Sequence, residues 1–298
     1  MPSDTVSLKK LKLTGLIALR KMYPLKRFIK YLANLPPSIK FRNLFGILPK
    51  YYNEPPLDYS VSDLFFWRSD EIWRTRFDLL NLPSILYPNK NISDRVTLVF
   101  YDQQGHEFLR KQITIPPFQT KAIRIEDILE GNSGFGSMAC FHEPSKSSMS
   151  APSQTCIVER GFTAYRRVTD EIPLWSYVHG AAYVLAKPPD HEEVQTTRRN
   201  LDRNILYQPQ LSFSDCDGFD LIYINPNNCD LAVKVRLFDN TLQVIREESE
   251  VLPPRGVKYF SLDNKDRTIY RVENESCAYM LRPFLLKYYE THFDIFHS

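Results

Sequence analysis

The sequence predicts a mainly β protein with two tandem antiparallel β-sandwiches of the immunoglobulin or fibronectin type, preceded by a basic helical segment. Three observations support this prediction. The chain has 298 residues, enough for two ordinary domains, and it is rich in aromatic residues (13%) and in proline (21 residues). Short β-branched and aromatic stretches alternate with turn residues every ~8–12 positions. One such stretch occurs in both halves of the chain.

The N-terminal segment, residues 1–58, is predicted to be a basic amphipathic helical arm and linker. Residues 1–50 hold eleven Lys or Arg and one acidic residue, a net charge of +10, so the remainder carries −7. The apolar residues of the arm fall on one helical face. We expect the arm to contact an anionic membrane surface or a protein partner, and packing on the protein's own body is the alternative. The cationic residues that would make this contact are Lys9, Lys10, Lys12, Arg20, Lys21, Lys26, Arg27 and Lys30.

The first predicted sandwich covers residues 59–168. Its strands are predicted from β-branched and aromatic stretches bounded by Gly or Pro. A polar segment rich in Ser and Pro is expected to form a long exposed loop before the last strand. The expected strands are 95–102, 111–115, 120–125, 136–142 and 156–168, and the expected loop is 143–154.

The repeated stretch reads ITIPPFQTKAIRIED in the first half and EVLPPRGVKYFSLDN in the second. A shift of 137 places Asp102 on Asp239 and Pro116-Pro117 on Pro253-Pro254. Because a double proline cannot join a strand ladder, it marks the crossing between two strands in each copy. The second sandwich is therefore predicted over residues 169–298, with a polar insertion at 187–210.

The repeated unit SDRVTLVFYDQQGHEFLRKQITIPPFQTKAIRIEDI resembles the core of the small β-sandwich domains of the sensory rhodopsin transducer family. The end of the pattern is matched by Lys121, Arg124 and Asp127, whereas Ser261 departs from it in the second copy. The resemblance covers about forty residues per domain and implies fold only. Members of that group act as binding or signalling modules and tend to oligomerise, so the resemblance implies a homo-oligomer.

Enzyme motifs are missing from the sequence. It has no Gly-rich phosphate loop, no G-x-S-x-G, no H-E-x-x-H and no dinucleotide fingerprint. We therefore expect a non-enzymatic binding or scaffold protein, while the question of catalysis stays open. The alternative is a metal-binding protein or metalloenzyme that holds a divalent metal, with ligands drawn from different strands. Its candidate ligands are His142, His179, His292, His297 and Asp294, with Glu143 beside the first. His106 and His191 lie in polar segments and are expected to be exposed.

The junction between the predicted domains, GFTAYRRVTDEIPLWSYVHG, concentrates aromatic residues and arginines. Aromatic rings and guanidinium groups suit a carbohydrate or an anionic ligand, through stacking and paired hydrogen bonds. Packing between the domains is the alternative explanation. The candidate ligand-binding residues are Tyr165, Arg166, Arg167, Trp175, Tyr177 and His179.

The five cysteines are odd in number and none has C-x-x-C spacing, so we expect reduced thiols in a cytoplasmic protein. No apolar run reaches the ~18 residues of a membrane span, so membrane association would be peripheral. Nucleic acid is an unfavoured partner because the body is acidic and the arm does not interleave its charges with exposed aromatic residues.

Overall fold

The computed structural model describes residues 59–143, 161–196, 200–209, 212–278 and 281–297. It also describes Leu32, Leu35, Pro37, Ser38 and Phe41. The chain divides into two compact units, Met1–Tyr51 and Tyr52–Ser298, and all described strands lie in the second unit. The cationic residues of the predicted arm lie outside the described residues, so the arm stays a prediction. No described helix is long and apolar enough to cross a membrane.

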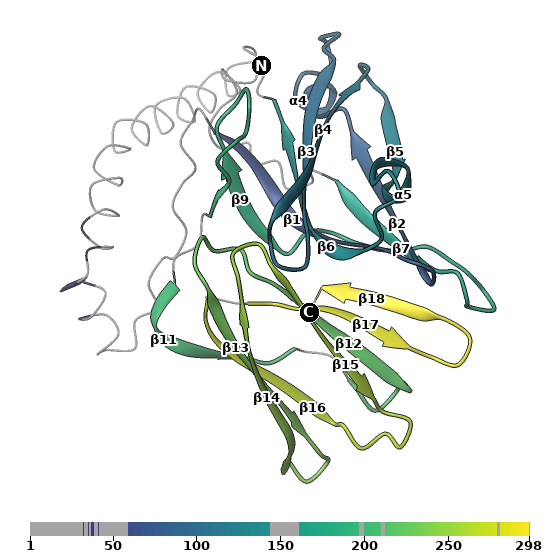
Figure 1. The fold of residues 1–298 in the computed structure, drawn as a ribbon, viewed down its shortest axis with the longest axis vertical. Coiled ribbons are helices and arrows are strands. Elements are labelled where there is room, and N and C mark those ends of the chain that lie inside the picture. The colour runs from purple at the N-terminus through teal and green to yellow at the C-terminus, as the bar shows by residue number, and fades with distance from the viewer. Residues whose placement is uncertain are drawn as a thin grey trace, which may run out of the picture. The chain divides into compact units, whose positions relative to one another are not determined.

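Antiparallel strands dominate the second unit, which confirms the prediction of a mainly β protein (Figure 1). The strands of the first half are β1 (Ser60–Ser69), β2 (Trp73–Leu80), β3 (Asp94–Tyr101), β4 (Glu107–Ile115), β5 (Thr120–Arg124), β6 (Gly134–His142), β7 (Phe162–Arg167), β8 (Ser176–Val178), β9 (Ala182–Ala186) and β10 (Gln195–Thr196). The strands of the second half are β11 (Asn200–Tyr207), β12 (Gly218–Ile224), β13 (Leu231–Phe238), β14 (Val244–Leu252), β15 (Val257–Asp263), β16 (Arg271–Ala278), β17 (Phe284–Tyr288) and β18 (Phe293–His297). Two short helices, α4 (Leu82–Leu86) and α5 (Ile125–Ile128), lie between strands of the first half.

The two halves repeat one strand order. In the first half the sheets run β10-β9-β1-β6-β3-β4 and β5-β2-β7-β8. In the second half they run β11-β16-β13-β14 and β15-β12-β17-β18. Each strand of the second half thus takes the place of the strand numbered ten lower, and β9 and β10 extend one sheet of the first half. The shift of 137 aligns β3, β4 and the start of β5 with β13, β14 and the start of β15.

The hairpin turns of the two copies share their geometry. The Asp102 carboxylate accepts hydrogen bonds from the backbone N–H groups two and four residues later, at 2.9 Å each. Asp239 makes the same two contacts at the same distance. Both hairpins also shift register at the last residue before this aspartate. The acidic residue closes the turn because its side chain satisfies backbone donors that have left the ladder.

A buried asparagine connects the strands around each double proline. Asn81, after β2, donates a hydrogen bond from Nδ2 to the carbonyl oxygen of Ile115 at 2.9 Å. Asn225, after β12, donates in the same way to Leu252 at 2.9 Å. Both asparagines are at most 2% exposed. The chain leaves the ladder at the double proline, and the asparagine amide donates to the carbonyl group of the residue that precedes it.

Three hydrophobic clusters form the interior. One lies within the first half and includes Phe65 and Phe77, and another lies within the second half and includes Phe219 and Leu285. The third joins the halves and includes Phe66 of β1 and Phe284 of β17. Alternate residues of β1 therefore enter different clusters, as the period of a strand requires when both faces of its sheet are buried.

The strands near the predicted domain boundary pair with the first half. The prediction separates the domains at residues 168 and 169, but β8 pairs with β7, and β9 pairs with β1. The predicted polar insertion 187–210 contains β11, which pairs with β16 as the first strand of the second half. β11 lies at a sheet edge, so its sequence can stay polar.

The paired asparagines give a stability test of the repeat. Asn81→Ala and Asn225→Ala each remove a donor from buried carbonyl groups, so each should lower the free energy of unfolding by about 1–3 kcal/mol. Urea denaturation measures this change, and Asn204→Ala, at an exposed site, should have little effect. A loss for one asparagine alone would contradict the equivalence of the two copies.

Candidate functional site

The outer face of β2 carries arginines because the strand alternates strictly. In its sequence WRTRFDLL, Trp73, Thr75 and Phe77 are buried, while Arg74 and Arg76 lie on the other face. This strand is absent from the elements predicted from the sequence, although its alternation is a sufficient signal.

The neighbouring strands place more arginines on the same face. Arg166 of β7 lies opposite Arg74, and Arg124 of β5 lies opposite Arg76. Tyr177 of β8 lies opposite Ala164, whose own partner on β2 is Arg76. Together these strands form a surface that we term the arginine face. It comprises Arg74, Arg76, Arg124, Arg166, Trp175 and Tyr177.

Aromatic rings order the guanidinium groups of the arginine face. The Cζ atoms of Arg76 and Arg166 each lie 5.1 Å from the centroid of the Trp175 ring. Arg76 also lies 5.4 Å from the Tyr177 ring and forms two hydrogen bonds with Asp78, at 3.0 and 2.9 Å. Such stacking holds the plane of each guanidinium group; Asp78 occupies the N–H edge of Arg76, whereas no described residue hydrogen-bonds the Arg166 guanidinium. The Arg166 Nε is buried and has no hydrogen-bond partner among the described residues.

The structure distributes the predicted junction residues over three places. Arg166, Trp175 and Tyr177 belong to the arginine face. Tyr165 is fully buried, and its hydroxyl donates to the Phe66 carbonyl at 2.6 Å, so it packs in the interior and does not face a ligand. Arg167 pairs with Asp170 and stacks over Tyr288, 5.1 Å from the ring centroid. These two residues serve packing, the alternative that the sequence left open.

The predicted metal ligands do not form one group. The rings of His179 and His297 lie together, with centroids 4.7 Å apart. His292 instead stacks on Tyr289 at 4.8 Å, and the Asp294 carboxylate accepts a hydrogen bond from Ser176. Within the described ranges no three His, Cys, Asp or Glu side chains are placed to hold a metal ion.

His142 lies in a separate buried cluster of the first half. Its Nδ1 is 2.7 Å from the Asp94 carboxylate, and its Nε2 is 3.8 Å from the Cys140 sulfur. Burial opposes the charged imidazole, but the adjoining Cys140 and Asp94 outweigh it and raise the pKa of His142 to about 10. Burial also raises the pKa of the Cys140 thiol.

The prediction that His191 is exposed is wrong. This residue is fully buried, it stacks on Phe141 with centroids 5.1 Å apart, and its Nε2 lies 3.0 Å from the Ser60 hydroxyl. Burial, together with the charge of Arg110, lowers the pKa of His191 to about 4. The polar segment that contains it therefore folds back onto β1 and β6. His106 is exposed, as predicted.

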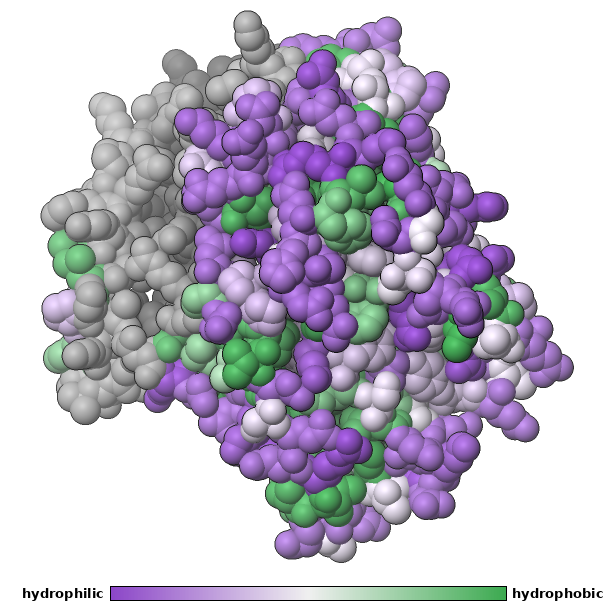
Figure 2. All heavy atoms as spheres, viewed as in Figure 1, coloured by the Kyte–Doolittle hydropathy of each residue, from purple (hydrophilic) through white to green (hydrophobic). Residues whose placement is uncertain are grey.

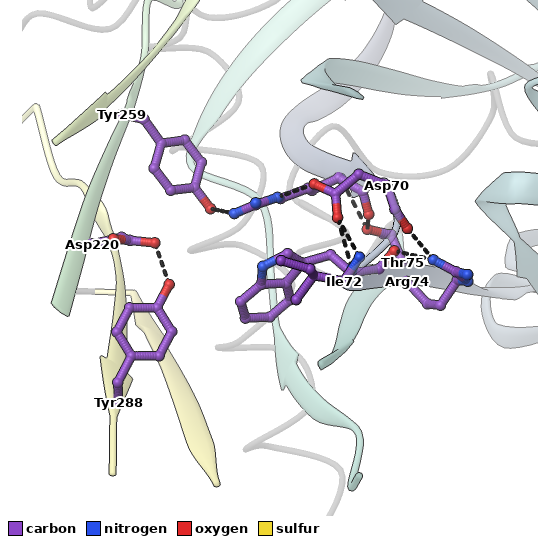
Figure 3. Close-up of polar contacts among 9 residues, drawn as sticks. Asp70, Ile72, Arg74, Thr75, Asp220, Tyr259 and Tyr288 are labelled. Carbon is purple, nitrogen blue, oxygen red and sulfur yellow. Dashed lines mark hydrogen bonds and ion pairs between the residues drawn. The ribbon is translucent and has the colours of Figure 1, made fainter. Parts of the chain in front are cut away.

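Polar side chains also meet between the halves (Figure 3). The Arg68 guanidinium bonds to Asp70 at 2.6 Å and to the Tyr259 hydroxyl at 3.2 Å. The Tyr288 hydroxyl donates to Asp220, which is 4% exposed. Burial raises the pKa of Asp220, although Tyr288 and nearby positive charges act in the opposite direction. These contacts satisfy polar groups inside an apolar interface, so we assign them a structural role.

The interface and the arginine face occupy equivalent positions of the repeat. When Asn81 is aligned with Asn225, Arg76 aligns with Asp220. The strand pairings then align Arg124 with Ser261 and Arg166 with Tyr288. In the second half this face meets the first half. In the first half the corresponding face carries arginines.

In comparisons with known proteins, no family model and no curated protein matches the chain. Two solved structures share weak similarity with it: "Structure of infectious bursal disease virus Gx strain" (10% identity, 74% of this chain, TM-score 0.14) and "Crystal structure of the T13 IBDV viral particle reveals a missing link in icosahedral viruses evolution" (11% identity, 73% of this chain, TM-score 0.14). The chain spans about half the length of both matched chains, 52% and 50%.

The interface network gives a prediction about stability. Tyr288→Phe removes the donor to a buried carboxylate and should lower the free energy of unfolding by about 1–3 kcal/mol. Tyr289→Phe is the matched control, because no described residue hydrogen-bonds the Tyr289 hydroxyl. Equal stability of the two variants in urea would show that the Asp220 contact is dispensable.

The buried His142 gives a prediction about pH. Its folded pKa, about 10, lies above the ordinary value of 6.5. The stabilisation is therefore complete below pH 6.5 and is lost as the pH rises toward 10. The free energy of unfolding of the wild type should fall over this window more steeply than that of His142→Gln. The difference should amount to a few kcal/mol at most, because one pKa unit corresponds to about 1.4 kcal/mol. Parallel pH profiles would exclude a charged His142.

Proposed function

We propose that the protein is a non-enzymatic binding module that recognises an acidic glycan through the arginine face. The observation that carries this proposal is the Trp175 ring with two guanidinium groups, those of Arg76 and Arg166, each 5.1 Å from its centroid. Carboxylate or sulfate groups on a sugar would pair with Arg166, held in this way without an ion-pair partner among the described residues, and with the neighbouring Arg124.

The composition of the face favours an anionic ligand. Four arginines share it with one carboxylate in contact, that of Asp78, which Arg76 already pairs. Arg124 and Arg166 make no ion pair with a described residue. The Tyr177 ring is 44% exposed beside them and offers an apolar surface to a sugar. A long nucleic acid fits less well, because residues 51–298 carry a net charge of −7.

The proposal also covers the fold of each half, the role of the basic arm and the assembly of the protein. Each half is an immunoglobulin- or fibronectin-like sandwich of the kind that the resemblance to the sensory rhodopsin transducer family implies. Four-stranded sheets that face each other across a hydrophobic cluster support this assignment. The basic arm tethers a cytoplasmic protein to an anionic membrane surface or a protein partner, and the protein forms a homo-oligomer.

Calorimetric titration tests the ligand class. An oligosaccharide of four uronic acids should bind, and a neutral oligosaccharide of equal length should bind this face much more weakly. Arg166→Ala and Trp175→Ala should each weaken binding about 10–100-fold, the equivalent of about 1.5–3 kcal/mol for a charge-assisted hydrogen bond.

Arg246→Ala is the control, since Arg246 is an exposed arginine on β14, in the other half. It should leave the affinity unchanged. If acidic and neutral oligosaccharides bind equally, or if Arg246→Ala has the same effect as Arg166→Ala, the arginine face is not the site.

A further inference from the structure

A concave site lies at the turn between β3 and β4. It is a cleft of about 340 Å³, at the lower end of the range of small-molecule sites. Aromatic rings and side-chain amides line it, and no Lys or Arg is among its lining residues. Its aromatic residues are Trp67, Phe108 and Phe135, and its side-chain amides belong to Gln103, Gln104 and Asn132.

The aromatic part of the cleft is fixed and partly accessible. The Trp67 indole N–H donates to the carbonyl groups of Tyr101 and Ser137, at 3.0 and 3.1 Å, so the ring cannot turn. The Phe108 ring lies 5.8 Å from Trp67 and is 39% exposed. Phe108 therefore supplies an exposed apolar surface on a rigid support.

The amide part is free to bond a ligand. The side chains of Gln103 and Gln104 are exposed, and no described residue hydrogen-bonds either of them. Asn132 donates from Nδ2 to the Leu129 carbonyl at 2.8 Å, which leaves its oxygen as an acceptor. Amides offer both donors and acceptors, which is the combination that hydroxyl groups require.

The second half of the chain holds this turn in place. The Val257 N–H donates to the Gln103 carbonyl at 3.0 Å. Gly105 fits so closely that an added Cβ would lie 1.9 Å from the Pro254 oxygen. The β3–β4 turn thus contacts the β14–β15 turn, as Figure 1 also shows. The backbone of this turn is therefore fixed from both halves, and only the glutamine side chains remain to be ordered by a ligand.

We propose that this cleft binds an uncharged pyranose sugar. The Phe108 ring would contact the apolar C–H face of the sugar, and the amides of Gln103, Gln104 and Asn132 would bond its hydroxyl groups. The only carboxylate in the lining, that of Asp102, is engaged by backbone N–H groups of its own turn. Lack of a cation in the lining separates this site from the arginine face, and the inference does not depend on the proposed function.

Saturation-transfer NMR with a panel of neutral methyl pyranosides tests the proposal. At least one pyranoside should bind with a dissociation constant of about 1 mM, as expected for a ligand of this size. Transfer should come from aromatic protons. Phe108→Ala should abolish the signal. Gln104→Ala, at an exposed side chain that does not support the fold, should weaken the signal and keeps the test valid if Phe108→Ala folds poorly.

Two controls separate this site from others. Tyr270→Ala removes an exposed aromatic residue outside the cleft, and Arg166→Ala alters the arginine face. Both should keep the pyranoside signal. Absence of transfer from every pyranoside, or a signal that survives both Phe108→Ala and Gln104→Ala, would overturn the proposal. If Phe108→Ala loses pyranoside binding and retains uronate binding, the two sites are distinct.

Discussion

The hydrophobic contact between the two halves is the constraint on which the rest of the structure depends. It buries the second face of the sheet that contains β1 and of the sheet that contains β12. All seven residues of β12 are therefore buried, including Asp220, whose carboxylate must find partners inside the protein. Tyr288 supplies one, and the neighbouring Arg68–Tyr259 contact satisfies other polar groups at the interface. The outer side of β2 is half-buried and carries arginines. Figure 2 shows mainly hydrophilic residues on the face in view.

The two copies keep what the fold needs and differ where their surroundings differ. Asn81 and Asn225 make matching hydrogen bonds, because both copies cross between sheets at a double proline. The outer faces of the equivalent strands β2 and β12 differ between the two copies. In the second copy this face meets the first half and carries Asp220 among apolar residues. In the first copy the same position is Arg76, on the arginine face.

The elements predicted from the sequence have local signals, although the strictly alternating strand β2 was missed. The strands β3 to β6, the hairpin turns and the internal repeat follow from β-branched runs, acidic turn residues and double prolines. β1 was missed because SVSDLFFWRS is buried on both faces and does not alternate, and β11 was missed because an edge strand tolerates polar residues. The candidate sites depend on contacts between distant residues. The position of His191 in a polar stretch gave no sign that it packs on Phe141, and Tyr165 stands beside two half-buried arginines that do not reveal its full burial.

The most direct test of the proposed function uses the indole N–H signals of the three tryptophans. Trp67 and Trp73 are each 3% exposed, whereas Trp175 is half-buried on the arginine face. In a ¹H–¹⁵N spectrum, an acidic oligosaccharide should shift the Trp175 indole signal and leave that of Trp73 in place. An acidic oligosaccharide that binds without moving the Trp175 signal, or that does not bind at all, would contradict recognition through the arginine face.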